Sequence, residues 1–240
     1  MEEIKLYNGK EKITFDKDTH RFYDSKGSSL ISVTGVTGTI DKSGALMGWV
    51  AKMMGLYLLQ EKEKGNDKIT EQLVDMAKKE YRRIKEEAAD IGQAIHDWVS
   101  EWIKGKKPEM PDDEKVVNGI TAFLKFQKEH KIKWLESERI IFSKKYHYAG
   151  ILDAVGKMGK DLVLFDFKSS NGIYSEMFFQ VAGYNIAYQE ETKKKITKKI
   201  ILRFGKDDGN FEIKELENGG KDEQAFLHCL ELTKRLKELK

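Results

Sequence analysis

The stretch GILDAVGKMGKDLVLFDFKSS, residues 150–170, consists of two apolar segments joined by the turn sequence KMGKD. Gly159 can adopt the positive φ that a tight hairpin requires at its first central position. If residues 159 and 160 form the loop, residue 158 faces residue 161, and the same count places Asp153 opposite Asp166. The stretch therefore predicts an antiparallel hairpin whose open end brings two carboxylates together.

Lys168 is expected on the same strand face as Asp166, because side chains two residues apart point to the same side. Opposed carboxylates repel each other unless a cation lies between them. Oxygen ligands of this kind suit a hard divalent cation, Mg²⁺ or Mn²⁺. Asp153, Asp166 and Lys168 therefore indicate a metal site at a strand end. The alternative is a structural salt bridge between Lys168 and either aspartate.

The rest of the chain predicts an α/β fold with a mixed central sheet flanked by helices. Residues 1–42 alternate polar and apolar positions around turn signals, which is typical of short antiparallel strands. Residues 43–131 carry apolar residues at helical spacing and form an expected helical block. Residues 132–240 are expected to form the catalytic core, within one domain of 240 residues. Its strands are predicted at 134–143, 147–157, 161–169, 197–205 and 211–217, with helices at 174–192 and from residue 222.

Composition excludes several classes of protein. The single cysteine, Cys229, rules out an internal disulfide, a four-cysteine zinc site and a cysteine-bound iron–sulfur cluster. The polar N-terminus is unlike a signal peptide, and no apolar run is long enough for a membrane span, so a cytoplasmic protein without membrane contact is expected. A net charge of +3 permits a basic groove but does not argue for one.

These residues resemble the PD-(D/E)XK nuclease superfamily: GILDAVG is followed, after a short turn, by LVLFDFKSS, with Asp166 in the second acidic position and Phe167 as X. The set is similar to the RecB-like branch, which carries a helical histidine upstream of the core, matched by His96 in IGQAIHDWVSEW. A Gln-X-X-X-Tyr pattern after the lysine is matched by Gln180 and Tyr184 in FFQVAGYNIAY. The N-terminal THRFYDSKGSSLISVTGVTG resembles the opening of phage-type and mitochondrial genome maintenance exonucleases.

The resemblance implies a restriction-endonuclease-like fold and a Mg²⁺- or Mn²⁺-dependent nuclease without an iron–sulfur cluster. It implies one or two ions held by Asp153, Asp166, the main-chain carbonyl of Phe167 and His96. Lys168 would act on the attacking water or the phosphate, Gln180 would orient Lys168 or the phosphate, and Tyr184 would border the nucleic acid. The chain contains no nucleotide-binding P-loop, so ATP is not expected.

Each supporting residue also has a simpler interpretation. His96 borders the apolar stripe of its helix and by itself is typical of a structural histidine. Gln180 and Tyr184 fit a solvated helix face almost as well. Glu138, at the start of the segment ERIIFS, is a further carboxylate of the region, but a surface strand charge is the expectation for it.

The resemblance thus implies a DNA exonuclease acting on single-stranded or open ends, in phage-type DNA processing, recombination or repair. An endonuclease of the same superfamily is the nearest alternative. A non-catalytic nucleic-acid-binding protein on the same fold is the alternative from another class. The complete set of two aspartates and a lysine favours an enzyme, because acidic groups facing phosphates without a metal would weaken binding.

Overall fold

The computed structural model describes residues 1–216 and 219–239. The chain forms two compact units, one of Met1–Ile40 with Ile95–Lys240 and the other of Asp41–Ala94. The sequence-based division at residues 42 and 131 differs from this grouping. Helix α4 (Glu114–His130) belongs with the sheet, because its buried face, including Val116, Ile120 and Phe123, packs on the larger unit.

The predicted mixed sheet is present and organises the larger unit. Its strand order is β4-β6-β7-β8-β9, and β5 pairs with β6. The β6–β7 and β8–β9 pairs are antiparallel, whereas β7–β8 and β4–β6 are parallel. The strands are β4 (Ile31–Ser32), β5 (Lys133–Ser143), β6 (Tyr148–Met158), β7 (Asp161–Lys168), β8 (Lys198–Phe204) and β9 (Phe211–Leu216).

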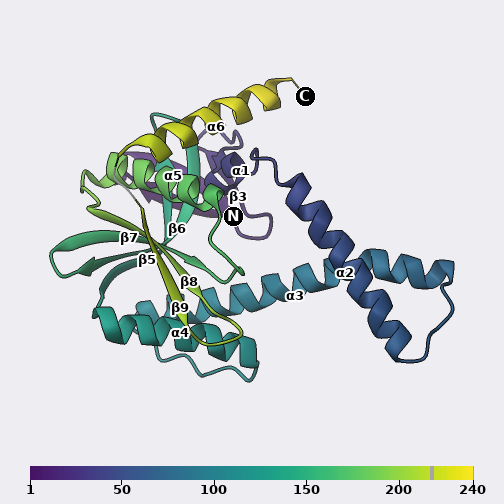
Figure 1. Cartoon of the computed structure of the whole chain (residues 1–240). Coiled ribbons are helices and arrows are strands. Elements are labelled where there is room, and N and C mark those ends of the chain that lie inside the picture. Colours follow the sequence, from purple (N-terminus) through teal and green to yellow (C-terminus); the bar gives the residue numbers. More distant parts are fainter. Residues whose placement is uncertain (217–218, 240) are drawn as a thin grey trace. The chain divides into compact units, whose positions relative to one another are not determined.

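Helices cover both faces of this sheet (Figure 1). Helices α5 (Ser175–Thr192) and α6 (Lys221–Glu238) lie over one face, and α4 lies over the other. The face under α5 is a core of mixed aliphatic and aromatic residues that includes Leu152, Leu164 and Tyr188. The α4 face is aromatic: the rings of Phe123, Phe126, Trp134, Phe165, Phe167 and Phe204 contact one another. Both faces are therefore buried, which holds the central strands rigidly.

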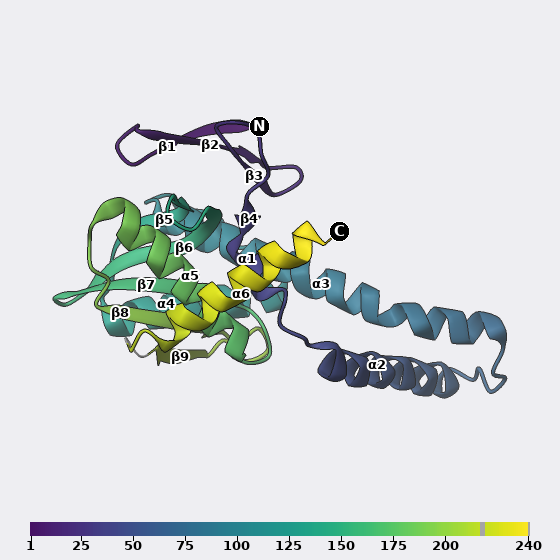
Figure 2. The same cartoon turned by 90° about the horizontal axis from the view of Figure 1, so that it is seen from above.

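The N-terminal residues form a separate antiparallel sheet of three strands, β1 (Glu2–Leu6), β2 (Glu11–Asp16) and β3 (Arg21–Asp24). Its apolar face, which includes Ile13, Phe15 and Phe22, packs with Phe142 of β5 and Ala149 of β6. Figure 2 shows this sheet beside the central one. The short strand β4 and the five-residue helix α1 (Val33–Thr37) follow, and the sequence pattern did not predict either.

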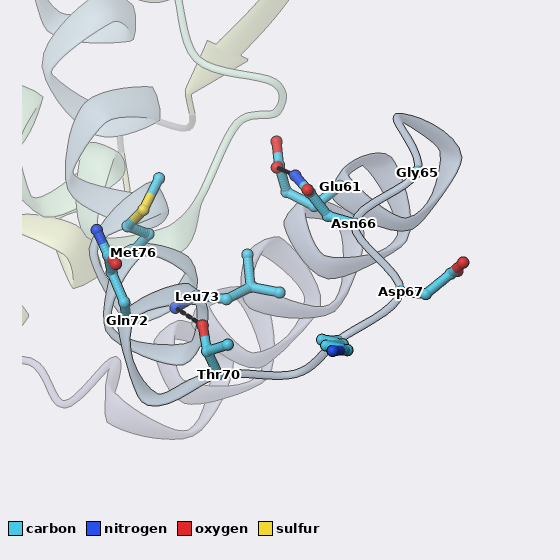
Figure 3. Close-up of a pocket in the computed structure, with 9 residues that line it drawn as sticks. Glu61, Gly65, Asn66, Asp67, Thr70, Gln72, Leu73 and Met76 are labelled. Carbon is cyan, nitrogen blue, oxygen red and sulfur yellow. Dashed lines mark hydrogen bonds between the residues drawn. The ribbon is translucent and has the colours of Figure 1, made fainter.

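The smaller unit is a helical hairpin of α2 (Ser43–Glu63) and the first part of α3 (Glu71–Ile103). Trp49 of α2 meets Tyr81 of α3 edge to face, with ring centroids 6.3 Å apart. A pocket of about 590 Å³ lies at the turn between the helices (Figure 3). Its polar groups bond locally, since Glu61 accepts from Asn66 and the Thr70 hydroxyl accepts from the Leu73 amide. None of the predicted site residues lines this pocket.

The helices that the structure describes are all too short or too polar to span a lipid bilayer.

Candidate functional site

The hairpin of β6 and β7 has the predicted register. Met158 pairs with Asp161, and the pairing continues to Ala154 and Phe165. Gly159 has a φ of 61°, as the tight turn requires. Asp153 and Asp166 are the next opposed residues in this register. At this point the main-chain pairing of the two strands ends, and a hydrogen bond to a side chain follows. The Phe167 amide donates to Asp153 Oδ2 at 2.6 Å, so Asp153 is anchored to the neighbouring strand where the two strands part.

Asp166 and Lys168 form a close pair at the end of β7. Asp166 is completely buried, and the Lys168 ammonium lies 2.5 Å from its Oδ2. Among the described residues, neither Asp166 oxygen has a partner in well-aligned hydrogen-bond geometry, so this ion pair is its main support. Burial raises the pKa of Asp166 to about 7; Lys168 opposes this rise and Asp153 adds to it. Burial lowers the pKa of Lys168, but the two aspartates raise it by more, so the amine stays protonated.

His96 comes from α3, which brings it to the Asp153 side of the site. Its Nδ1 lies 4.0 Å from Asp153 Oδ1, and its ring meets that of Phe167 edge to face. The neighbouring stripe residues Ile91 and Ile95 are buried, while the His96 side chain remains about a quarter exposed. The imidazole therefore faces the carboxylate from an accessible position, as a ligand would.

Glu138 joins this group, although its strand position alone suggested a surface charge. One ligand atom from each of His96, Glu138 and Asp153 lies within 4.8 Å of the others. Glu138 is exposed at the molecular surface, yet the chain around its carboxylate removes part of its hydration. This desolvation, together with the charge of Asp153, raises the pKa of Glu138 to about 7. The sequence around Glu138 gives no signal that Glu138 approaches Asp153, because this approach depends on how β5 pairs with β6.

Gln180 and Tyr184 lie one turn apart on α5, and the Gln180 amide donates to the Tyr184 hydroxyl at 2.9 Å. Tyr184 is buried rather than on a solvated helix face. Burial raises the pKa of Tyr184 well above its ordinary value, and the charges of Asp153 and Asp166 raise it further. Tyr184 therefore remains a neutral phenol.

Taken together, the site gathers anionic oxygens that lack enough protein donors. Asp153 has one main-chain donor, and Asp166 has only its lysine partner in the described chain. A buried carboxylate without hydrogen bonds is unfavourable, and a divalent cation would compensate it. The oxygen-rich donor set with one imidazole fits Mg²⁺ or Mn²⁺.

Comparisons with known proteins add fold likenesses only. No protein-family model matches the chain, and no characterised protein matches it in sequence. A structural likeness to SSO0001 has 17% identity and a TM-score of 0.33, and covers 49% of this chain and 57% of that protein. A candidate exonuclease of Eubacterium rectale has 11% identity and a TM-score of 0.47. That match covers 86% of this chain and 79% of the other protein.

The alkaline exonuclease LHK-Exo of Laribacter hongkongensis, in a structure with dAMP, gives 13% identity and a TM-score of 0.40. That match covers 87% of this chain and 92% of LHK-Exo. These identities and TM-scores are too low to indicate a function for this chain.

Proposed function

We propose that this protein is a metal-dependent nuclease that hydrolyses phosphodiester bonds in DNA. The observation that carries the proposal is the fully buried Asp166, which lies beside Asp153 and Lys168 with too few hydrogen-bond donors. A stability role alone would favour an apolar residue at this position, because a buried ion pair rarely stabilises more than its apolar replacement. A bound cation and an anionic substrate give these charges a chemical use.

Asp153 and Asp166, with the main-chain carbonyl of Phe167 and with His96, are the groups that would hold one or two Mg²⁺ or Mn²⁺ ions. When bound, such an ion polarises a phosphate and lowers the pKa of a coordinated water. The phosphate would therefore meet the carboxylates only through the cation, which explains how acidic residues serve an anionic substrate.

Among the described residues, Lys168 is the basic side chain that pairs with the buried Asp166. It stays protonated, so it can stabilise negative charge on the phosphate or orient a water through its hydrogens. Removing one such electrostatic group typically costs about 3–4 kcal/mol of transition-state stabilisation. Gln180 and Tyr184, which are fixed to each other, would position Lys168 or the nucleic acid from the α5 side.

A substrate panel tests the proposal. Labelled linear single-stranded DNA, double-stranded DNA and RNA are each incubated with the full chain in Mg²⁺, Mn²⁺ or a chelator. We expect shortening of DNA from its ends in either metal, faster on single-stranded or open ends, and none in chelator. Binding of DNA without cleavage in any metal would overturn the nuclease and indicate a binding protein. Internal cutting without end shortening would indicate an endonuclease.

A further inference from the structure

Glu138 occupies an unusual position in β5. Ser137 pairs with Ala154 and Arg139 pairs with Leu152, so Glu138 lies opposite Asp153 in the β5–β6 register. Its φ is 52°, in the left-handed region that residues other than glycine rarely adopt. The backbone of β5 is therefore irregular at Glu138, the residue that faces Asp153.

Three separate elements meet at this point. His96 comes from α3, Glu138 from β5 and Asp153 from β6, and their ligand atoms lie within 4.8 Å of one another. Ligands of Mg²⁺ or Mn²⁺ lie ~2.1 Å from the ion, so two ligand atoms on one ion are up to ~4 Å apart. Small rotations of these partly accessible side chains would bring all three onto one cation.

A second observation comes from Asp166, the residue opposite Asp153 on the neighbouring strand. Strand β6 lies between β5 and β7, so Asp153 has Glu138 on one side and Asp166 on the other. Asp166 is completely buried, and both its oxygens lack well-aligned hydrogen-bond donors in the described chain. Three carboxylates thus lie across adjacent strands, with His96 at one end and Lys168 at the other.

We propose that Glu138 is a metal ligand that, with His96 and Asp153, forms a second divalent-cation position beside the one at Asp153 and Asp166. The inference rests on the proposed nuclease function, for which a second cation would supply further stabilisation of negative charge on the phosphate. The second cation position includes the His96 imidazole. This favours Mn²⁺ over Mg²⁺, because Mg²⁺ prefers an all-oxygen shell.

The test counts bound Mn²⁺ on the full chain by titration calorimetry and by the electron paramagnetic resonance signal of free Mn²⁺, independently of cleavage. We expect two ions per wild-type chain and one per Glu138→Gln chain. Glu231→Gln, which changes an exposed glutamate of α6, is the matched control and should retain two. Glu138→Asp keeps a shorter carboxylate and should bind the second ion more weakly than wild type but better than Glu138→Gln.

Two results would overturn the inference while leaving the nuclease intact. They are a cleaving wild type with a single bound Mn²⁺, and a Glu138→Gln variant that binds two ions with wild-type affinity. A wild type that neither binds Mn²⁺ nor cleaves DNA would overturn the proposed function as well. Circular dichroism of each variant checks the fold. If Glu138→Gln does not fold, Mn²⁺ binding by Glu138→Asp is the deciding measurement. An affinity of Glu138→Asp for both ions equal to that of wild type would contradict the proposal.

Discussion

At the scale of single residues, Asp166 is unfavourable for stability, and the proposed metal site would give it a use. Asp166 is completely buried and relies on one lysine, although hydration would favour an exposed carboxylate. Burial raises its pKa to about 7. In the metal-free protein, the folded state therefore binds a proton at Asp166 more tightly than the unfolded chain does, where the pKa is about 3.9.

This difference predicts a pH dependence of stability in chelator. A carboxyl group whose pKa is raised by folding favours the folded state when protonated, so stability should fall as pH rises from about 4 through about 7. Urea unfolding across this range measures the slope. Asp166→Asn should reduce the slope, because it removes the group that titrates. If the free energy of unfolding of Asp166→Asn changed with pH as steeply as that of wild type, Asp166 would not be the buried group that titrates.

Lys168 should have separable effects on stability and turnover. Lys168→Ala leaves Asp166 buried without its ion-pair partner, and breaking a buried pair costs up to ~3–5 kcal/mol. The loss should be smaller at low pH, where Asp166 is protonated, and the double variant Lys168→Ala/Asp166→Asn should recover most of it. Additive losses in this double-mutant cycle would show that the two residues do not support each other.

The same Lys168→Ala variant, assayed below its unfolding temperature, should lose turnover while keeping most of its affinity for Mn²⁺ and DNA. The reason is that the ammonium is expected to act mainly on charge that develops in the transition state. An unchanged kcat with a raised KM would instead make Lys168 a residue that only positions the phosphate.

The residues that could be predicted are those fixed by local counting. The turn at Gly159 determines that Asp153 and Asp166 approach each other. Glu138 could not be placed this way, because a register shift between Trp134 and Glu136 changes which residue of β5 faces Asp153. Tyr148 is fully buried and donates to the Gly183 carbonyl at 2.6 Å, so it is not available to stack on a base.

At the scale of elements, the long helices and strands lie where the sequence pattern predicts them, because each extends over several turns or several alternations of side-chain direction. Helix α1 has only five residues and β4 only two, so neither presents a full period. They form because Ser32 caps α1 by accepting from the Gly35 amide, and because β4 pairs with β6. The first contact is a helix cap by a single residue, and the second is a pairing with a distant strand. Hydrophobic periodicity reveals neither of them.

The packing of α5 on α6 gives a prediction at this scale. A Cβ on Gly183 would lie 2.5 Å from the ring of Phe226, which is completely buried. Gly183→Ala should therefore overpack the interface and reduce the free energy of unfolding by ~1–3 kcal/mol. Gly172→Ala, whose added Cβ would meet only ordinary contacts at 3.6 Å or more, should be nearly neutral. Equal stability of the two variants in urea unfolding would contradict the close approach.

At the scale of the whole molecule, the charge distribution limits where DNA can be bound. The lysine-rich run at residues 193–198 precedes β8, and Lys198 pairs with Val163 near the start of β7. Lys168 lies at the other end of β7, so this run does not border the candidate site. If DNA binds at the candidate site as proposed, the contacts with its phosphate backbone come from residues outside this run.

A requirement for free ends is the whole-molecule prediction. The helical unit, Asp41–Ala94, carries Lys42, Trp49 and Lys52, residue types that hold a strand by charge and stacking. If it guides a strand to the site from an end, linear single-stranded DNA is degraded and closed single-stranded circles resist. Rapid cutting of circles, or full activity on DNA with bulky blocks at both ends, would contradict threading and leave a metal-dependent endonuclease.

The measurement that tests the central claim most directly compares cleavage by wild type, Asp153→Asn, Asp166→Asn and Asp161→Asn in Mn²⁺. Asp161 begins the same strand that carries Asp166 near its other end, so it is a matched control. We predict that both site variants lose cleavage of linear DNA while remaining folded, and that Asp161→Asn cleaves as wild type does. Near-normal cleavage by Asp153→Asn or Asp166→Asn would contradict the assignment of this site as the catalytic centre.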